Sequence, residues 1–387
     1  RWAFHIDSKN FSIRYKSNMF SEELEKYDWD ETTRFISTRT AADVRAALRK
    51  EHLSVEDFMA LISPAAEPYL EEMAQLSHRY TLERFGKTIS MYIPMYVSNA
   101  CSNCCVYCGF NHNNPLTRVT LTMDQVRAEC EAIRELGPFE NLLIVSGEHP
   151  KINGADYIEE VLKTARPYFN NLTIEVGPMS TEEYERLTHS GLNGVVCFQE
   201  TYHKANYRNY HPKGMKSIFD WRVNGFDRMG QAGVHKIGMG VLIGLEDWRT
   251  DLTMLARHLR YLRKNYWKTK YSINFPRMCP AEGGYQPKVV MSDRELAQVT
   301  FAFRIFDHDV DISYSTRENP TFRANMMKLG VTSMSAGSKT EPGGYRSTPD
   351  ALEQFEVSDP RSPKAVTEEI RKLGYEAVWK DWDKIFD

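Results

Sequence analysis

Four of the seven cysteines in this chain of 387 residues lie within the eight positions from 101 to 108. Thiolates are soft ligands, and thiolates gathered this tightly usually bind a soft metal centre. Cys101, Cys105 and Cys108 have the spacing C-x3-C-x2-C, and an aromatic residue, Tyr107, stands just before the last of them. We therefore expect these three cysteines to be metal ligands and Cys104 to be a small buried thiol.

Two other arrangements of these cysteines are conceivable. Tandem C-x2-C pairs can hold a structural zinc ion, but such pairs are normally separated by about a dozen or more residues, so that the chain can fold back around the metal. Here the two pairs abut. A disulfide between Cys104 and Cys105 would be strained. A zinc-stapled binding protein stays open as the alternative, and a disulfide framework is disfavoured.

Length, composition and charge describe an ordinary globular protein. The chain is long enough for two domains, but α/β barrels commonly occupy about 200–250 residues as one unit. The net charge of −3 and the pI near 6.5 provide no basic field for nucleic acid. No apolar run approaches the roughly 20 residues that span a bilayer, and Arg1–His5 do not resemble a secretory signal. We expect a protein of the reducing cytoplasm, without membrane or nucleic acid as a partner.

The chain divides into three parts by its pattern. Residues 1–85 are polar and helical, with helix patterns at 39–50, 54–62 and 66–85, and form an N-terminal helical extension. Residues 86–340 alternate short apolar runs with amphipathic helices. Residues 341–387 form a C-terminal segment, with an exposed linker at 358–363 and one helix near 364–374.

Eight apolar runs in the middle part read as parallel strands buried on both faces. They are 88–97, 141–147, 171–176, 194–199, 236–242, 271–275, 311–315 and 331–334. Helices lie between them, and Thr122, Ser180 and Ser292 each begin a capping-box pattern. The alternation predicts an α/β fold, a (β/α)8 barrel of the TIM type; a doubly wound open sheet is the alternative.

Such barrels place their active sites at the carboxyl ends of the strands, and the cysteine cluster follows the first strand at that end. Other polar residues follow strands in the same way. Gly147 and Glu148 come after the second strand, Glu175 ends the third and Glu200 ends the fourth. Buried carboxylates are costly without partners, so we expect Glu175 and Glu200 to face a polar ligand. For Glu175 the alternative is a structural ion pair with an arginine.

Arginines that could hold carboxylate groups lie close to these strand ends. Arg222, on the helix before strand five, can bind a carboxylate through both arms of its guanidinium, whereas we place Arg228 on the surface. Gly240 in strand five permits close approach to the backbone. Arg317 follows strand seven beside hydroxyl residues and suits an amino-acid carboxylate; the alternative is an ion pair with Glu318 or with another carboxylate at the rim of the barrel.

Together these stretches resemble the radical S-adenosylmethionine (SAM) superfamily and, within it, the aromatic amino-acid lyase family. The similarity runs from roughly residue 28 to the C-terminus. Besides the cysteine loop it rests on Gln199–His203, Asp220–Arg222, Ser315–Glu318, 333–338 and Pro342–Tyr345.

The resemblance implies a 4Fe–4S cluster held by Cys101, Cys105 and Cys108, with one iron left open for SAM. It implies further that residues at or near this end of the barrel hold SAM, namely Gly147, Glu148, Glu175, Glu200, Arg222 and Gly240. The family has a Gly-Gly-Glu-like stretch after the second strand. The first of those glycines is Ser146 here, which leaves the backbone contacts possible.

For function, the resemblance implies a carbon–carbon lyase similar to the tyrosine lyases of thiamine biosynthesis. Such enzymes cleave the Cα–Cβ bond of L-tyrosine to 2-iminoacetate and p-cresol, while SAM gives methionine and 5′-deoxyadenosine. Arg317 would hold the substrate carboxylate, Ser335 would assist it, and Tyr96 would lie beside the substrate. An electron donor such as flavodoxin or ferredoxin and a thiazole synthase are the implied partners.

Other functions stay open. The tyrosine lyase of hydrogenase maturation and a tryptophan lyase belong to the same family. The maturation enzyme has further cysteines after its barrel for a second cluster, whereas the last cysteine here is Cys279, and the ending Trp379–Trp382 is similar to the thiamine enzyme. We therefore expect a tyrosine lyase of thiamine biosynthesis. An iron–sulfur electron carrier is the alternative from another class, and it would need four protein ligands for its cluster.

Overall fold

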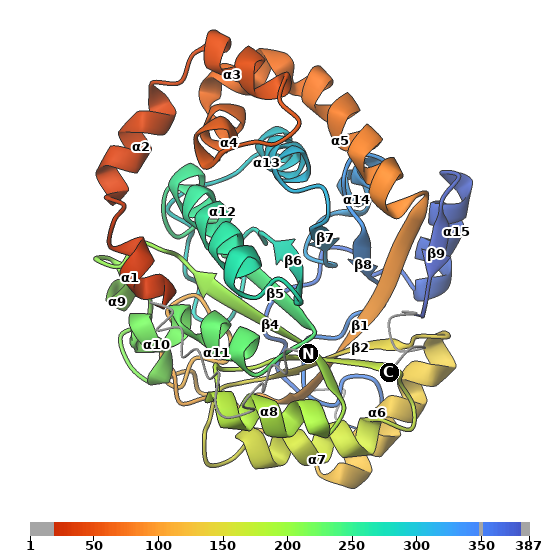
Figure 1. Cartoon of the computed structure of the whole chain (residues 1–387). Coiled ribbons are helices and arrows are strands. Elements are labelled where there is room, and N and C mark those ends of the chain that lie inside the picture. The colour runs from red at the N-terminus through yellow and green to blue at the C-terminus, as the bar shows by residue number, and fades with distance from the viewer. Residues whose placement is uncertain (1–18, 348–350, 381–387) are drawn as a thin grey trace, which may run out of the picture.

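The computed structural model describes residues 19–347 and 351–380. Eight parallel strands form a closed barrel, because β1 pairs with β2 on one side and with β8 on the other (Figure 1). The strands are β1 (Thr88–Ser98), β2 (Asn141–Ser146), β3 (Asn171–Glu175), β4 (Leu192–Glu200), β5 (Lys236–Val241), β6 (Lys270–Asn274), β7 (Asp311–Tyr314) and β8 (Ser333–Ser335). The predicted barrel is confirmed, and the open sheet is excluded.

The predicted strands agree with the observed ones except at their ends. The largest differences, two residues, are at the starts of β4 and β8: β4 begins earlier, at Leu192, and β8 begins later, at Ser333 rather than at Val331. The amide of Val331 still donates a hydrogen bond to the carbonyl of Met326, at the end of the preceding helix. Local hydrogen bonding at a helix end therefore delays the start of this strand.

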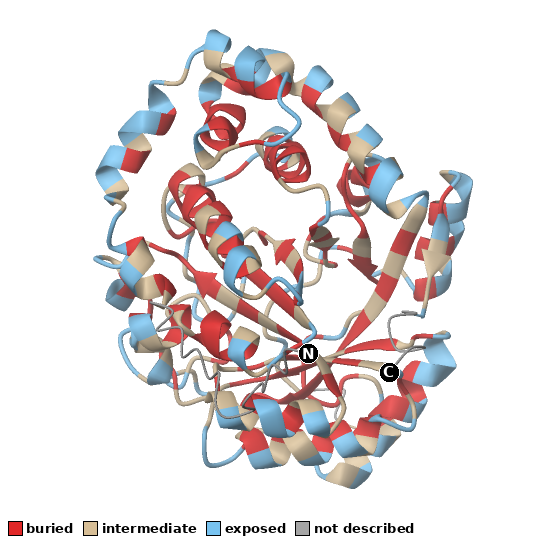
Figure 2. Ribbon diagram, in the orientation of Figure 1, coloured by how far each residue is buried: buried red, intermediate tan, exposed pale blue. Residues whose placement is uncertain are grey.

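Helices connect the strands and cover the barrel. They are α6 (Met123–Leu136), α7 (Ala155–Ala165), α8 (Thr181–His189), α9 (Tyr207–Tyr210), η2 (Met215–Ser217), α10 (Phe219–Val223), α11 (Gly225–Gln231), α12 (Trp248–Asn265), α13 (Asp293–Phe306) and α14 (Pro320–Met326). Thr122, Ser180 and Ser292 form the predicted capping boxes of α6, α8 and α13. The inner helix faces and the strands share one continuous apolar core, and the outer faces are exposed (Figure 2).

The N-terminal extension packs beside α12 and α13 (Figure 1). It consists of α1 (Phe20–Leu24), α2 (Trp29–Ser37), α3 (Ala41–Leu48), α4 (Val55–Ile62), η1 (Pro64–Tyr69) and α5 (Leu70–Phe85). The ring of Phe20 stacks on the ring of His258 in α12, with 3.7 Å between the ring centres. This contact fixes α1, the first described helix of the extension, against the barrel. Within the described residues, no helix combines the length and the apolar character needed to cross a bilayer.

Two predictions of exposure were wrong, and buried polar contacts explain both. Arg228 is only 8% exposed: its guanidinium donates to the carbonyls of Met179 and Trp221 and stacks over the Trp221 ring. The predicted exposed linker at 358–363 contains Asp359, which is fully buried and forms an ion pair with the equally buried Arg323. Only some residues of the linker face solvent.

The C-terminal segment adds a strand that was not predicted. After α15 (Pro363–Lys372), β9 (Glu376–Val378) pairs in parallel with Thr88–Ser90 at the start of β1. The barrel is already closed at β1, so this ninth strand lies outside the closed ring. Trp382, part of the ending compared above, lies outside the described residues.

Candidate active site

The cysteine loop leaves β1 at the carboxyl end of the barrel and is held by its neighbours. The amide of Ser102 donates to the carbonyl of Glu148 at 2.9 Å, and the amide of Cys104 donates to the carbonyl of Lys213 at 3.2 Å. Cys104 is 3% exposed, in agreement with its predicted place as a buried thiol. The loop therefore adopts a defined shape between the ends of β2 and β4.

The other three thiols lie close enough to influence one another. Burial raises the pKa of Cys101 to about 11 and also raises the pKa values of Cys105 and Cys108. Negative charge on Cys108 raises the pKa values of Cys101 and Cys105, whereas the ammonium of Lys216 lowers the pKa values of Cys105 and Cys108. Metal ligation removes the thiol protons and relieves this repulsion.

This donor set fits a cluster with three protein ligands. Within the described ranges, no three His, Cys, Asp or Glu side chains converge closely enough to hold a single metal ion. A four-iron cluster makes a different demand, since each iron takes its own thiolate and the three sulfurs stand apart. Cys101, Cys105 and Cys108 supply three such thiolates on one loop.

A network of charged side chains lies beside the loop. Arg222 donates from Nη1 to Oε1 of Glu148 at 2.8 Å and from Nε to the carbonyl of Phe198 at 2.7 Å. Asn103 in the cysteine loop donates to the other oxygen of Glu148, also at 2.8 Å. Burial alone would raise the pKa of Glu148, but Arg222 and Lys216 hold it below its usual value. Glu148 is therefore a carboxylate tied to the loop by Asn103.

Glu200 completes this network through an unusual backbone. It has φ of +71°, the one positive value among the described residues other than glycine, next to an irregularity in the pairing of β4 with β5. Its carboxylate accepts a hydrogen bond from Nζ of Lys216 at 2.6 Å. Non-glycine residues persist in this region only where the surroundings hold them there, and such residues cluster at functional sites.

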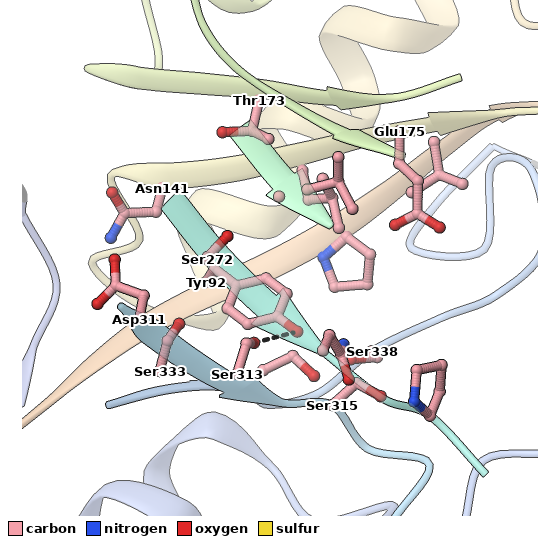
Figure 3. A pocket seen from close by; sticks show the side chains of 18 of the residues that line it. Tyr92, Asn141, Thr173, Glu175, Ser272, Asp311, Ser313, Ser315, Ser333 and Ser338 are labelled. Carbon is pink, nitrogen blue, oxygen red and sulfur yellow. Dashed lines mark hydrogen bonds between the residues drawn. The ribbon is translucent and has the colours of Figure 1, made fainter. Parts of the chain in front are cut away.

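Two cavities meet at the mouth of the barrel. The first, about 120 Å³, is lined by Cys108 and the charged network, namely Glu148, Glu200, Lys216 and Arg222. The second, about 170 Å³, runs down the barrel axis between polar side chains of several strands, including Tyr92, Thr173, Ser272 and Ser313 (Figure 3). Glu175 and Arg317 line both cavities, so a molecule in one would lie next to a molecule in the other.

Among the described residues, neither Glu175 nor Arg317 has an ion-pair partner at its charged end. No described residue donates a hydrogen bond to the carboxylate of Glu175, and none provides a carboxylate within ion-pair distance of Arg317. Burial raises the pKa of Glu175 to about 7, and the positive charge of Arg317 opposes this rise. Glu318, the alternative partner of Arg317, instead binds Arg277. Both groups are thus available to a ligand.

The other two residues predicted to lie near the substrate also line the axial cavity. Tyr96 donates its hydroxyl to Oε1 of Gln354 at 2.8 Å. Ser335 accepts a hydrogen bond at Oγ from the amide of Thr316 at 3.1 Å. Both side chains therefore have fixed positions beside the cavity that Arg317 enters.

The two predicted glycines lie at tight backbone contacts. A Cβ atom on Gly147 would come within 2.4 Å of the carbonyl oxygen of Ala100, which precedes the cysteine loop. A Cβ atom on Gly240 would come within 2.1 Å of the carbonyl oxygen of Asn274 and 2.4 Å of the Phe198 ring. Close packing explains both glycines, and contact with SAM stays a prediction for each.

Four residues of the site were missed in the sequence. Asn103 lies in the cysteine loop after β1, so the rule that found Glu148 could have found it, whereas Lys216 lies in η2, well beyond the end of β4. Gln354 and Phe355 come from the segment after the barrel, which carried no such signal. They lie against Tyr96 and Arg317, respectively.

Comparison with known proteins gives consistent results. The model of the radical SAM superfamily matches residues 95–255, and that of the biotin and thiamin synthesis associated domain matches residues 274–376. The chain is 47% identical to 2-iminoacetate synthase of Salmonella typhimurium, over 94% of this chain and 97% of that protein. The enzyme of the same name from Escherichia coli is 46% identical over the same shares.

Solved structures agree with this comparison. The FeFe-hydrogenase maturase HydG is 30% identical, with a TM-score of 0.82 over 93% of this chain and 78% of that chain. HydG from Carboxydothermus hydrogenoformans is 28% identical, with a TM-score of 0.87 over 95% of this chain and 86% of that one.

Proposed function

Because this chain belongs to the 2-iminoacetate synthase family of radical SAM enzymes, we propose that it cleaves the Cα–Cβ bond of L-tyrosine to 2-iminoacetate and p-cresol. The observation that carries the proposal is the 47% identity to a 2-iminoacetate synthase across nearly the full length of both chains. Radical SAM enzymes use a 4Fe–4S cluster and SAM. The product would serve the thiazole branch of thiamine biosynthesis.

The proposed cluster ligands are Cys101, Cys105 and Cys108. When bound and supplied with one electron, the cluster and SAM provide a 5′-deoxyadenosyl radical and methionine. The cavity beside Cys108 offers charges of both signs to a zwitterionic amino acid such as the methionine part of SAM. We assign Glu148, Glu200 and Arg222 to SAM, and Lys216 joins them because it lines the same cavity.

Arg317 is the proposed ligand of the tyrosine carboxylate. A guanidinium without a protein carboxylate suits this role, since its planar fork matches a carboxylate through two parallel hydrogen bonds. Ser335 and Tyr96 lie on the same cavity and would position the substrate. The barrel wall keeps bulk water and other reactants away from the reacting atoms.

The proposed reaction begins at the amino group of the bound tyrosine. The radical takes one hydrogen atom from the tyrosine amino group, and the Cα–Cβ bond then breaks to give 2-iminoacetate. The hydroxybenzyl fragment takes up one electron and one proton to become p-cresol. A cytoplasmic flavodoxin or ferredoxin is the proposed source of electrons.

Product analysis tests the proposal. The reconstituted enzyme is incubated anaerobically with SAM, a reductant and tyrosine, and the matched control is Cys105→Ala. We expect p-cresol, 5′-deoxyadenosine and glyoxylate, the hydrolysis product of 2-iminoacetate, in near-equal amounts. Adding a thiazole synthase that consumes 2-iminoacetate should lower the glyoxylate yield.

The structural similarity to HydG supports a second candidate, a tyrosine lyase of hydrogenase maturation. Carbon monoxide or cyanide as a major product would favour it. Cleavage of tryptophan with tyrosine inert would instead indicate a tryptophan lyase. A colourless protein that binds one zinc ion would contradict all three.

A further inference from the structure

The segment after the barrel crosses the mouth of the site. We call residues 351–361 the strap. The amide of Gln354 donates to the carbonyl of Thr340 at 3.0 Å, the amide of Glu356 donates to that of Pro280 at 3.2 Å, and the amide of Ser358 donates to that of Thr316 at 3.0 Å. The strap is thus hydrogen-bonded to segments that follow β6, β7 and β8.

The strap also packs directly on the cysteine loop. A Cβ atom on Gly109, the residue after Cys108, would come within 2.6 Å of the carbonyl oxygen of Gln354. At its far end the strap is anchored by the buried ion pair of Asp359 with Arg323. Its position over the cluster loop is therefore set from both ends.

Gln354 makes two side-chain contacts beneath the strap, one through each end of its amide group. Its Oε1 accepts the hydroxyl proton of Tyr96 at 2.8 Å, and its Nε2 lies 3.8 Å from Sγ of Cys108 as a donor. A cluster-bound thiolate can only accept hydrogen bonds, so it requires the NH2 side of the amide. The hydroxyl of Tyr96 can donate to the carbonyl side, which holds the amide in this orientation.

We propose that Gln354 is a positioning residue that raises the reduction potential of the cluster by donating a hydrogen bond to the Cys108 thiolate. Reduction adds negative charge to the cluster and its sulfurs, so an N–H donor stabilises the reduced form more than the oxidised form. Hydrogen bonds to the sulfurs are among the factors that set such potentials. The inference rests on the proposed cluster ligands and does not depend on which amino acid is cleaved.

The test measures the midpoint potential of the cluster by anaerobic redox titration followed by electron paramagnetic resonance, with SAM and without tyrosine. Gln354→Leu removes the donor, and we expect the reduction equilibrium to fall about tenfold, which for one electron is about 59 mV more negative. Gln354→Glu keeps the acceptor for Tyr96 but replaces the donor with a carboxylate, so its potential should fall further. Gln286→Leu, the same change at an exposed position, should leave the potential unchanged.

Several results would overturn the inference. One is a Gln354→Leu enzyme with a full cluster and the wild-type potential. If Gln354→Leu does not hold a stable cluster, a Gln354→Glu enzyme with the wild-type midpoint potential would overturn the inference instead. Loss of the cluster from both variants also contradicts it, because it would make Gln354 necessary for cluster assembly. Failure to cleave tyrosine, by contrast, bears only on the proposed function.

Discussion

The guanidinium carbon of Arg317 lies 3.4 Å from the centre of the Phe355 ring. Stacking of this kind holds the planar group in one orientation without using its hydrogen-bond donors. Within the described residues no carboxylate is in ion-pair distance of those donors. Phe355 therefore orients a free guanidinium at the junction of the two cavities.

Replacing Arg317 with lysine should weaken tyrosine binding and leave SAM binding intact. Lysine keeps the charge but loses the two-pronged geometry, and hydrogen bonds to charged groups are worth about 1.5–3 kcal/mol. We expect the KM for tyrosine to rise about 10- to 100-fold. Phe355→Leu should cause a smaller rise, since it only loosens the guanidinium. A loss of SAM affinity in Arg317→Lys would reverse the roles assigned to Arg317 and Arg222.

Glu175 should make the protein less stable as pH rises. Burial raises its pKa in the folded chain from 4.5 to about 7, with Arg317 opposing the rise. The folded state then binds the proton more tightly than the unfolded state, so the stabilisation is complete below about pH 4.5 and lost on passing pH 7. Between about pH 4.5 and pH 7, the melting temperature of the wild-type protein should fall relative to that of Glu175→Gln. Above about pH 7, the difference between the two melting temperatures should stay constant. Glu376→Gln, the same substitution at an exposed position, is the matched control and keeps Glu175 in place.

The substitution Asp359→Ala should destabilise the whole fold. Asp359 and Arg323 are both 0% exposed, and loss of one partner leaves a buried charge without compensation. Breaking such pairs costs about 3–5 kcal/mol of unfolding free energy. The exposed pair of Glu135 with Arg346 provides the control, and Glu135→Ala should cost only about 0–1 kcal/mol in the same denaturation experiment. Equal losses in the two variants would show that burial does not set the strength of these pairs.

The fold could be predicted because its signals are local. The capping boxes at Ser180 and Ser292 involve residues three positions apart, and each apolar run defines its own strand. The same holds for the part of the site that follows strand ends, since the barrel brings Glu175, Glu200 and Arg317 to one face. The closed barrel could be predicted from the eight alternations of apolar strand and amphipathic helix.

The remaining parts of the site depend on contacts between distant positions. Gln354 lies 246 residues after Cys108 in the chain, and no sequence pattern near either residue predicts their contact. Asp359 was predicted to be exposed because its neighbours are polar, and its burial depends on ion pairs with Arg361, two residues away, and with the distant Arg323 of α14. Arg228 was misplaced for the same reason, since the carbonyls that bind it come from Met179 and Trp221.

The cysteines should divide into ligands and non-ligands. Ala replacement of Cys101, Cys105 or Cys108 should abolish the iron–sulfur absorption and the cleavage of SAM, because three thiolates are the only protein ligands the proposed cluster has. Cys104→Ala and Cys279→Ala are the matched controls. Cys279 lines the cavity beside Cys108, so it tests whether a nearby thiol can serve as a fourth ligand. Cys104, which is only 3% exposed, tests whether the two adjacent C-x2-C pairs bind the metal.

Iron content and anaerobic 5′-deoxyadenosine formation would be measured for all five variants. A Cys104→Ala protein without iron would point to a zinc-like arrangement of paired cysteines, and a Cys279→Ala protein without iron would point to a closed, four-ligand cluster that leaves no iron for SAM.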